Sequence, residues 1–463
     1  MNNYTYTVAA ISTPPGKGGV AIIRLSGDDA LEILSKVFIP RSNKSISDYP
    51  PRMQIRGDIL HEGVLIDDGM ATYFKAPNSY TGEDVCEISC HGGILVTSAV
   101  LEALIANGAH PADKGEFTKR AFLNGKLSLT EAESIGNLLE AESREQIKLA
   151  SSKSRHLLLE RIGELRSSLT SLLSSIYARI DYPDEDLGDF TDDETLERLT
   201  AIKMDAENLL STYRTGKAIN EGIKTVICGK TNVGKSSIYN LLLGYDAAIV
   251  TEIEGTTRDV LSDKISLGRV LLRLSDTAGV RKDAPDLVEK IGIERTKKEI
   301  SESELILAVF DLSREFDRED EEILKEIRGI DCAKIAILNK SDLQEVFDRK
   351  RLNGIFDKTV TVSAKGGRAE VLGEITEAVN SLFTDEKISV GEDAIISSAR
   401  QNAELLRAIE AIDSAISAYE AGMPTDCASS DIEKALGAIA ELDGKAISDE
   451  VVADIFSKFC VGK

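Results

Sequence analysis

The chain of 463 residues is 42% hydrophobic and 29% charged, and its formal net charge is −23. The length predicts one to four domains. The acidity disfavours extended non-specific contact with nucleic acid, so a role on RNA requires a local basic patch or a basic partner. The six cysteines form no C-x-x-C pair and there are only four histidines, which argues against a disulfide framework and a His/Cys metal site.

The sequence predicts no targeting or membrane segment. Residues 1–16 lack the basic region and apolar core of a signal peptide, and no apolar run approaches about 18 residues. We therefore expect a cytoplasmic protein in a reducing environment, with no membrane association.

Residues 1–120 alternate short strand-like and helical patterns, as is typical of a small α+β domain. Three polar side chains stand out: Arg24 ends a strand, Glu87 lies within one, and Lys126 follows in Asn124-Gly125-Lys126-Leu127. Taken singly, each also fits the solvated face of a sheet. His91-Gly92-Gly93 fits either a catalytic loop or a turn with a capping histidine. The predicted strands are 4–11, 20–25, 69–74 and 85–90, and the predicted helices are 29–37 and 98–107.

Two helical regions flank the middle of the chain. Apolar residues recur at spacings of three and four through residues 121–215 and again through 385–463, with the clearest helices at 194–213, 403–421 and 432–440. The simplest arrangement is a helical domain in two parts, with another domain inserted at 216–384.

The inserted segment contains a phosphate-binding loop. The motif Gly229-Lys230-Thr231-Asn232-Val233-Gly234-Lys235-Ser236 fits G-x-x-x-x-G-K-[ST], with a predicted strand before it at 223–228 and a helix after it at 237–243. Its backbone N–H groups and the helix N-terminus would face phosphates, and Lys235 would reach the β- and γ-phosphates. Alone, this motif favours a phosphate-binding loop but also fits a chance Gly-rich turn, so the companion motifs are needed to distinguish the two.

Companion motifs follow in the order of a GTPase. Asp276-Thr277-Ala278-Gly279 follows a predicted strand at 270–274, and Asn339-Lys340-Ser341-Asp342 follows one at 334–338. The Asp342 carboxylate can accept hydrogen bonds from guanine N1 and N2, which adenine cannot supply, so the predicted nucleotide is GTP. Further strands are predicted at 305–310 and 359–362, which indicates a mostly parallel, Ras-like sheet. The predicted GTP-binding residues are Asn232, Val233, Gly234, Lys235, Ser236, Ser237, Thr256, Thr257, Asp276, Thr277, Ala278, Gly279, Asn339, Lys340, Asp342, Ser363, Ala364 and Lys365.

The predicted metal ligands fit a GTPase, but the catalytic group differs from a Ras-like pattern. Ser236 and Thr257 are the predicted Mg²⁺ ligands. Val280 stands where a Ras-like GTPase has its water-orienting glutamine, so another group must orient the water. Asn232, with the backbone from Thr251 to Thr256, is the candidate site for a K⁺ ion that supplies the charge of an arginine finger.

These motifs together resemble the bacterial tRNA-modifying GTPase family MnmE (TrmE). The resemblance covers the whole chain and extends beyond the GTPase motifs to more specific ones. These are Thr13-Pro14-Pro15-Gly16-Lys17-Gly18-Gly19, Asn78-Ser79-Tyr80-Thr81-Gly82-Glu83-Asp84, Gly115-Glu116-Phe117, Ala121-Phe122-Leu123-Asn124-Gly125-Lys126-Leu127 and Phe459-Cys460-Val461-Gly462-Lys463. Within the GTPase segment the resemblance rests on Asn232, Gly255-Thr256-Thr257-Arg258-Asp259 and Glu289-Lys290-Ile291-Gly292-Ile293-Glu294-Arg295.

The resemblance implies an architecture and a reaction. Residues 1–120 would bind tetrahydrofolate and dimerise, 121–215 and 385–463 would form the split helical domain, and 216–384 would be the GTPase domain. Such proteins are homodimers that act with an FAD-containing partner, MnmG (GidA), on tRNA. They use a one-carbon tetrahydrofolate (5,10-methylene or 5-formyl) to install an aminomethyl or carboxymethylaminomethyl group at C5 of the wobble uridine, and their GTP hydrolysis is K⁺-stimulated.

The resemblance also assigns residues by motif. Arg24, Glu87, Lys126 and Lys463 match the folate-binding positions, and Glu289 matches the acid that orients water. Compared with the family, this chain carries one extra residue near Asp283-Ala284-Pro285. The motif Glu289-Lys290-Ile291-Gly292 nevertheless fixes which residue aligns with the family's acid. Cys460 matches a terminal cysteine that is either a reactive thiol or an inert residue in a turn.

Two other functions share the GTPase motifs. A GTP-dependent ribosome or RNA assembly factor would switch partners without chemistry of its own, but it usually carries a basic RNA-binding module, which this acidic chain lacks. A membrane-reshaping GTPase would need an amphipathic basic helix or a lipidation site. Folate binding by residues 1–120 separates the modification enzyme from both.

Overall fold

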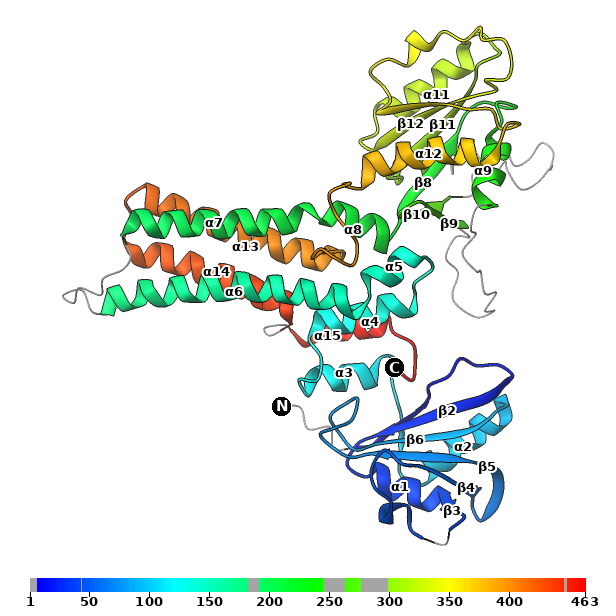
Figure 1. Cartoon of the computed structure of the whole chain (residues 1–463), viewed down its shortest axis with the longest axis vertical. Coiled ribbons are helices and arrows are strands. Elements are labelled where there is room, and N and C mark those ends of the chain that lie inside the picture. The colour runs from blue at the N-terminus through cyan, green and yellow to red at the C-terminus, as the bar shows by residue number, and fades with distance from the viewer. Residues whose placement is uncertain (1–5, 43, 182–190, 245–262, 276–298, 445–447) are drawn as a thin grey trace. The chain divides into compact units, whose positions relative to one another are not determined.

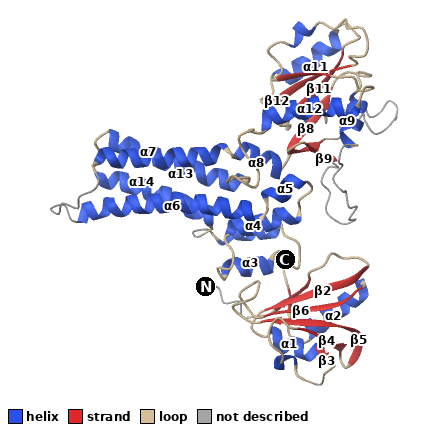
Figure 2. Cartoon of the chain, viewed as in Figure 1, coloured by secondary structure: helices blue, strands red, loops and turns tan. Residues whose placement is uncertain are grey.

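The structure is a computed structural model that describes residues 6–42, 44–181, 191–244, 263–275, 299–444 and 448–463 (Figure 1). The chain forms two compact units, one of residues 1–136 and 440–463 and the other of residues 137–439. Helices and strands are distributed unevenly between them, with one sheet in each unit and most of the long helices in the second (Figure 2). This agrees with the predicted multidomain α+β and α/β class.

The first unit is built on a seven-stranded sheet of order β3-β4-β5-β6-β2-β1-β7. Neighbouring strands are antiparallel except β1 and β7, which are parallel. All strands predicted here are present with different ends, and β3, β4 and β7 were not predicted. The strands are β1 (Val8–Ile11), β2 (Gly18–Ser26), β3 (Phe38–Pro40), β4 (Gln54–His61), β5 (Val64–Phe74), β6 (Val85–Gly92) and β7 (His110–Pro111), with a short 3₁₀ helix η1 (Ile46–Asp48).

One face of this sheet carries the core. Helices α1 (Ala30–Val37) and α2 (Ile94–Ala106) pack against Ile23 of β2 and Ile88 of β6, all fully or nearly fully buried. Because successive side chains of a strand point to opposite faces, the residues between these apolar ones lie on the other face. That second face carries polar side chains such as Arg24 beside a smaller apolar cluster that includes Val8 and Ala10.

A smaller core joins distant parts of the chain within the same unit. Leu129 of α4 packs with Phe456 of α15 and with Phe459, and Phe117 packs near β1 in a separate cluster. Segments from both ends of the sequence therefore form one folded unit. The helices involved are α3 (Glu116–Leu123), α4 (Leu129–Leu139) and α15 (Asp449–Ser457).

The second unit contains a bundle of long helices. Helix α7 packs against α6 and α13, so helices from before and after the nucleotide-binding segment lie together, as predicted. Capping boxes begin α7 at Thr191 and α13 at Ser398, which fixes where these helices start. The helices are α5 (Arg144–Leu149), α6 (Ser152–Asp181), α7 (Asp192–Ser211), α8 (Tyr213–Asn220), α13 (Ala399–Glu420) and α14 (Thr425–Asp443).

The second sheet has six strands in the order β13-β12-β11-β8-β10-β9. All pairs are parallel except β9–β10, and each strand except β9 was predicted. Helices α9 (Lys235–Leu243) and α12 (Arg368–Phe383) contribute to the core on one face, and α11 (Arg318–Arg328) to the core on the other. The strands are β8 (Ile223–Cys228), β9 (Asp263–Leu267), β10 (Val270–Leu274), β11 (Leu305–Asp311), β12 (Ala333–Asn339) and β13 (Lys358–Thr361), and η2 (Arg349–Leu352) is a short 3₁₀ helix. Among the residues described, no helix has the length and apolar character needed to cross a lipid bilayer.

Candidate functional site

The phosphate-binding loop connects the buried strand β8 to helix α9. Its two glycines have backbone conformations that L side chains rarely adopt, with φ of +145° at Gly229 and +106° at Gly234. A Cβ on Gly229 would lie 2.4 Å from the Val309 carbonyl oxygen, and one on Gly234 would lie 2.1 Å from Asn339 Nδ2. The loop therefore needs glycine at both positions for its conformation and for its close packing.

Lys235 points back over this loop. Its half-buried ammonium group donates hydrogen bonds to the carbonyl oxygens of Gly229 (2.9 Å) and Lys230 (2.8 Å). Burial lowers the pKa of Lys235, because a partly desolvated ammonium lacks water to stabilise its charge. Phosphate oxygens at the N-terminus of α9 would restore that stabilisation.

The predicted base-recognition residues come together beside the loop. Asn339 donates from Nδ2 to the Val233 carbonyl oxygen (2.8 Å) and accepts from the Ala364 N–H (3.0 Å). Ser363 donates to Asp342 Oδ1 at 2.5 Å, and this hydrogen bond lowers the pKa of Asp342. The Asp342 carboxylate is thus oriented and ionised, as recognition of guanine requires.

Lys340 links the same loop to the neighbouring strand. It donates to the Asn232 carbonyl oxygen (3.0 Å) and to Asp311 Oδ2 (2.6 Å), and Asp311 is almost fully buried. Burial alone would raise the pKa of Asp311, but the hydrogen bonds from Lys340 and Ser313 lower it overall. Lys365 lies exposed at the rim.

The described metal-binding candidates are accessible. Ser236 and Ser237 lie exposed in the first turn of α9, and Asn232 adopts a left-handed conformation with φ of +61°. A hydroxyl beside Lys235 has the oxygen that Mg²⁺ prefers, so Ser236 fits that role. Several of the predicted metal-binding, GTP-binding and catalytic residues lie outside the described residues: Thr251 to Thr256, Thr257, Asp276, Thr277, Ala278, Gly279 and Glu289.

A second polar site lies on the face of the first sheet opposite α1 and α2, where Phe117 of α3 packs against Val8 and Ala10 of β1. Arg24 of β2 and Glu87 of β6 are directly opposite in the antiparallel register. Arg24 donates from Nε (2.9 Å) and Nη2 (2.8 Å) to Glu87 Oε1. The Arg24 guanidinium also lies 5.5 Å from the ring centre of Tyr80 and 5.6 Å from that of Phe117. An ion pair flanked by two aromatic rings can bind a flat, polar heterocycle.

Residues 460–463 join this site. The Lys463 carbonyl oxygen accepts from the Phe117 N–H (3.2 Å), and the Cys460 carbonyl oxygen accepts from the Gly115 N–H (3.2 Å). Gly462 has φ of +93°, and a Cβ there would lie 2.4 Å from the Ile11 carbonyl oxygen. The segment is therefore packed closely against β1 and α3, while the Cys460 side chain is exposed.

Lys126 reaches the site through a loop. Its Nζ donates to the Pro77 carbonyl oxygen (3.0 Å), and Asn124 Nδ2 donates to that of Thr81 (2.8 Å). The same loop carries Tyr80, which contacts Arg24. The four predicted folate residues thus belong to one connected set of contacts.

Arg120 supports this site and was not predicted. Its fully buried guanidinium pairs with Glu116 (2.7 Å) and Glu83 (3.1 Å), and Glu83 also accepts from Ser26 (2.7 Å). Burial would lower the pKa of Arg120, but the pairs with Glu116 and Glu83 raise it overall. Both acids belong to motifs of the family resemblance, 78–84 and 115–117, but no local pattern pairs them with Arg120.

Among the described residues, His91 pairs with Asp67 and does not cap α2. It is exposed at the end of β6, where Nδ1 lies 2.8 Å from Asp67 Oδ1, and the pair raises the pKa of His91. The N-cap of α2 is Gly93.

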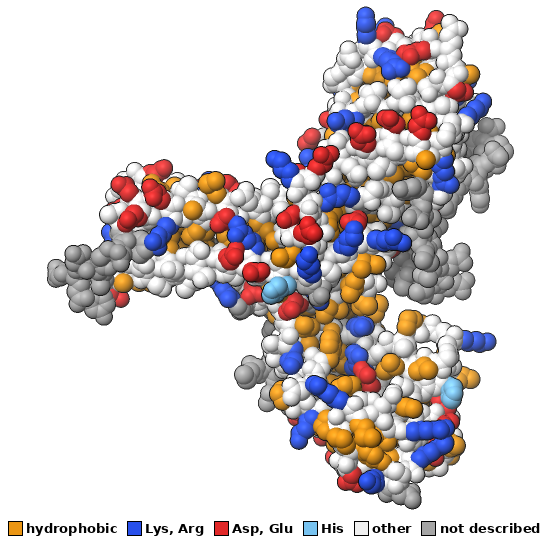
Figure 3. Space-filling model, viewed as in Figure 1, with side chains coloured by type: hydrophobic (Ala, Val, Ile, Leu, Met, Phe, Trp, Pro, Cys, Tyr) orange, Lys and Arg blue, Asp and Glu red, His pale blue; other side chains and the backbone are white. Residues whose placement is uncertain are grey.

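Exposed apolar side chains occur on the segments next to His91, which are β2, the start of β5 and the start of α2. On this unit, hydrophobic side chains are prominent on the face seen in Figure 3. The largest exposed fractions are 86% for Leu95, 68% for Val64, 64% for Val20 and 60% for Leu65. Such a group of exposed apolar side chains is unusual on a monomer and typical of an interface.

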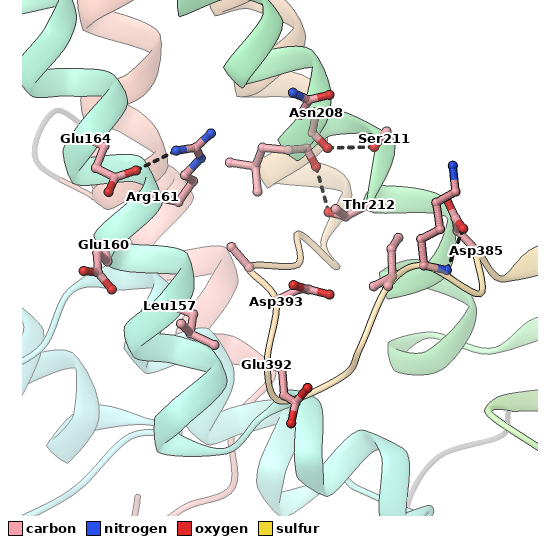
Figure 4. Close-up of a pocket in the computed structure, with 14 residues that line it drawn as sticks. Leu157, Glu160, Arg161, Glu164, Asn208, Ser211, Thr212, Asp385, Glu392 and Asp393 are labelled. Carbon is pink, nitrogen blue, oxygen red and sulfur yellow. Dashed lines mark hydrogen bonds and ion pairs between the residues drawn. The ribbon is translucent and has the colours of Figure 1, made fainter.

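A pocket of about 500 Å³ lies in the second unit. It is lined by α6, by the end of α7 and by the segment 385–394, which connects α12 to α13 (Figure 4). Thr212 accepts from the Ile396 N–H (3.1 Å), and Thr215 accepts from the Asp385 N–H (3.0 Å). The pocket thus adjoins the connection between the nucleotide-binding sheet and the long helices.

Known proteins resemble this chain along its whole length. A family described as GTP-binding protein TrmE N-terminus matches residues 7–126, and one described as MnmE helical domain matches residues 129–460. A tRNA modification GTPase MnmE of Thermotoga maritima is 40% identical over 460 residues, covering 99% of this chain and 100% of that protein. Proteins of the same name from Natranaerobius thermophilus and Clostridioides difficile are 39% and 36% identical, each over 99% of both chains.

Proposed function

This chain belongs to the MnmE family of tRNA modification GTPases, and from that premise we propose a specific reaction for it. With an FAD-containing MnmG (GidA) partner, it installs the aminomethyl or carboxymethylaminomethyl group at C5 of the wobble uridine of tRNA in the cytoplasm. A 5,10-methylene or 5-formyl tetrahydrofolate supplies the one-carbon unit, and K⁺ stimulates its GTP hydrolysis.

Different GTP-binding residues have different roles in GTP hydrolysis. Lys235 and the loop N–H groups bind the phosphates, while Asn339, Asp342 and the 363–365 segment bind guanine. Ser236 and Thr257 are the Mg²⁺ ligands, and Asn232 with the backbone from Thr251 to Thr256 binds K⁺. Mg²⁺ and K⁺ supply positive charge where negative charge develops during hydrolysis. Glu289 orients the attacking water.

The contact of residues 460–463 with the Arg24–Glu87 site carries the proposal. It joins the most specific motifs of the family resemblance into one polar site with two aromatic rings. The pteridine ring of a folate has donors, acceptors and a flat face that suit this combination of an ion pair and aromatic rings. A GTP-dependent assembly factor that only switches partners would not need such a site.

The exposed apolar group around His91 supports a homodimer formed through the first unit. A second copy would cover Leu95, Val64, Val20 and Leu65, whose exposure to water is otherwise unfavourable. A two-fold axis would place the same surface of both copies in contact.

The contacts of α8, between the nucleotide-binding sheet and the long helices, support a coupling of GTP hydrolysis to movement of the long helices. Gly216 of α8 approaches the Ile396 carbonyl oxygen so closely that a Cβ would lie 2.1 Å from it. Lys217 of the same helix pairs with Glu304 at the start of β11 at 2.5 Å. Movement of the nucleotide-binding sheet would therefore move α8 and the long helices, and with them the surface offered to MnmG and tRNA.

The test is nucleoside mass spectrometry of tRNA from cells that lack this protein. We expect the C5 aminomethyl-type groups to disappear from wobble uridines, and to return with the wild-type chain but not with Asp276→Ala. Unchanged modification would contradict the proposal and favour an assembly factor. Folate binding by the purified Asp276→Ala chain then serves as the control that the variant is folded.

A further inference from the structure

Lys230 of the phosphate-binding loop makes contacts that the loop motif does not require. The motif leaves this position open to any residue, yet the Lys230 side chain is 5% exposed. Its Nζ donates to Asp317 Oδ2 (2.7 Å) and to Asp320 Oδ2 (2.8 Å). A lysine buried in this way must be paired, because an isolated buried ammonium is unfavourable.

The two carboxylates belong to the start of helix α11. Asp317 is the N-cap and accepts from the Asp320 N–H (3.2 Å), while Asp320 accepts from the Asp317 N–H (3.2 Å), so the pair forms a capping box. Asp320 is 1% exposed, and its Oδ1 is buried without a hydrogen-bond partner among the described residues. The ion pair with Lys230 is therefore the main interaction that offsets the cost of burying the Asp320 side chain.

The backbone of Lys230 contacts the phosphate-binding lysine. The Lys230 carbonyl oxygen accepts from Lys235 Nζ at 2.8 Å. Lys230 thus makes two kinds of contact. Its side chain binds the N-terminus of α11, and its carbonyl group accepts from the Lys235 ammonium, which would face the β- and γ-phosphates. Displacement of Lys230 would turn this carbonyl and shift Lys235.

We propose that Lys230 is a positioning residue for GTP hydrolysis, which fixes the phosphate-binding loop to the capping box of α11 and thereby sets the position of Lys235. The inference rests on the GTPase activity described above. It extends that activity by making the start of α11 part of the machinery that aligns the phosphates. Because small displacements of a catalytic charge are costly, the contact acts on turnover more than on binding.

The principal test compares steady-state GTP hydrolysis by the full-length wild-type chain and Lys230→Met. Methionine keeps the length of the side chain and removes the ammonium. We expect kcat to fall roughly tenfold, and the affinity for GDP, measured with a fluorescent analogue, to change less than about threefold. Lys325→Met is the matched control, because Lys325 is an exposed lysine on the same helix.

Asp317→Asn is the second variant, because it keeps the helix cap. Asparagine caps helices as well as aspartate does, and Asp317 is half exposed, so this chain folds even if Lys230→Met does not. We expect a smaller fall in kcat, about threefold. The double variant should be no slower than Lys230→Met alone, since both changes break the same contact.

A structural role alone would give a different result. Both variants would then melt at lower temperature and keep the wild-type kcat well below melting, which would overturn the proposal. If the wild-type chain itself fails to hydrolyse GTP, the GTPase assignment fails instead, so the two failures are distinguishable.

Discussion

Arg24 and Glu87 lie opposite each other on β2 and β6, and Arg24 donates two hydrogen bonds to a single carboxylate oxygen of Glu87. No described residue is seen to donate to the second carboxylate oxygen of Glu87, so this oxygen can accept a hydrogen bond from a ligand. The pair is partly shielded from water, with 17% of the Arg24 side chain and 25% of the Glu87 side chain exposed.

Replacement of Arg24 should remove folate binding and spare GTP hydrolysis. In Arg24→Gln we expect the affinity for 5-formyltetrahydrofolate to fall at least about tenfold, because a hydrogen bond to a charged group contributes about 1.5–3 kcal/mol. Isothermal titration calorimetry measures this. Arg56→Gln is the control, since Arg56 is an exposed arginine of β4. Equal affinity in Arg24→Gln and wild type would contradict the folate assignment.

Residue 462 should be intolerant of any side chain. In Gly462→Ala the added Cβ meets the Ile11 backbone, so residues 460–463 cannot dock and folate affinity should drop about tenfold or more. Gly422→Ala provides the comparison. Gly422 also has a positive φ, of +63°, but a Cβ there meets nothing within 4 Å. If Gly422→Ala loses as much folate affinity as Gly462→Ala, the loss comes from backbone strain and not from failed docking of residues 460–463.

Gly234→Ala should abolish nucleotide binding. Its Cβ would occupy the position of the Asn339 side chain amide, which connects the phosphate-binding loop to the base pocket. Titration with a fluorescent GDP analogue should show no saturation at concentrations that saturate wild type. Gly367→Ala, at an open position with ordinary backbone angles, should bind normally.

The cysteines should divide into two classes of reactivity. Burial raises the pKa of Cys90 to about 11 and that of Cys228 to about 12, and it raises the pKa of Cys86 further. At pH 8 only about one in a thousand Cys90 side chains would be thiolate, which is the reactive form. Alkylation of the native chain followed by peptide mass spectrometry should modify the exposed Cys427 and Cys460. Modification of Cys86 before unfolding would be inconsistent with this core.

A charge in the exposed apolar group should break the proposed dimer. We expect Leu95→Asp to sediment as a monomer in analytical ultracentrifugation, because its charge would be buried unpaired in the interface. Leu343→Asp is the control, since Leu343 is also exposed but lies in the second unit. A wild-type chain that is monomeric at micromolar concentration would exclude the dimer directly.

Sequence patterns predicted the nucleotide-binding sheet well because its signals are local. Strands β8 and β10 have the predicted ends, since each is a mostly apolar run that ends next to a GTPase motif. Strand β9 was missed because only Ile265 and Leu267 of its five residues are apolar. Strand β4 was missed because Gly57 and Asp58 interrupt its pattern.

Long-range pairs were beyond reach of the sequence patterns. Arg120 and Glu83 are far apart in the chain, and only the folded sheet brings them together. Lys230 occupies an open position of its motif, so nothing in the local sequence distinguishes it from a solvated lysine. The contact between residues 460–463 and α3 is of the same kind, although family resemblance had already associated Lys463 with Arg24.

The docking of residues 460–463 on β1 and α3 has a consequence for the synthesis of the protein. A ribosome makes the strands of the first sheet early, but it adds this segment only after the GTPase motifs and the long helices have been translated. The proposed folate site is therefore incomplete throughout most of translation. A chain that terminates early can retain every GTPase motif and still lack this site, so folate binding would report that synthesis reached residue 463.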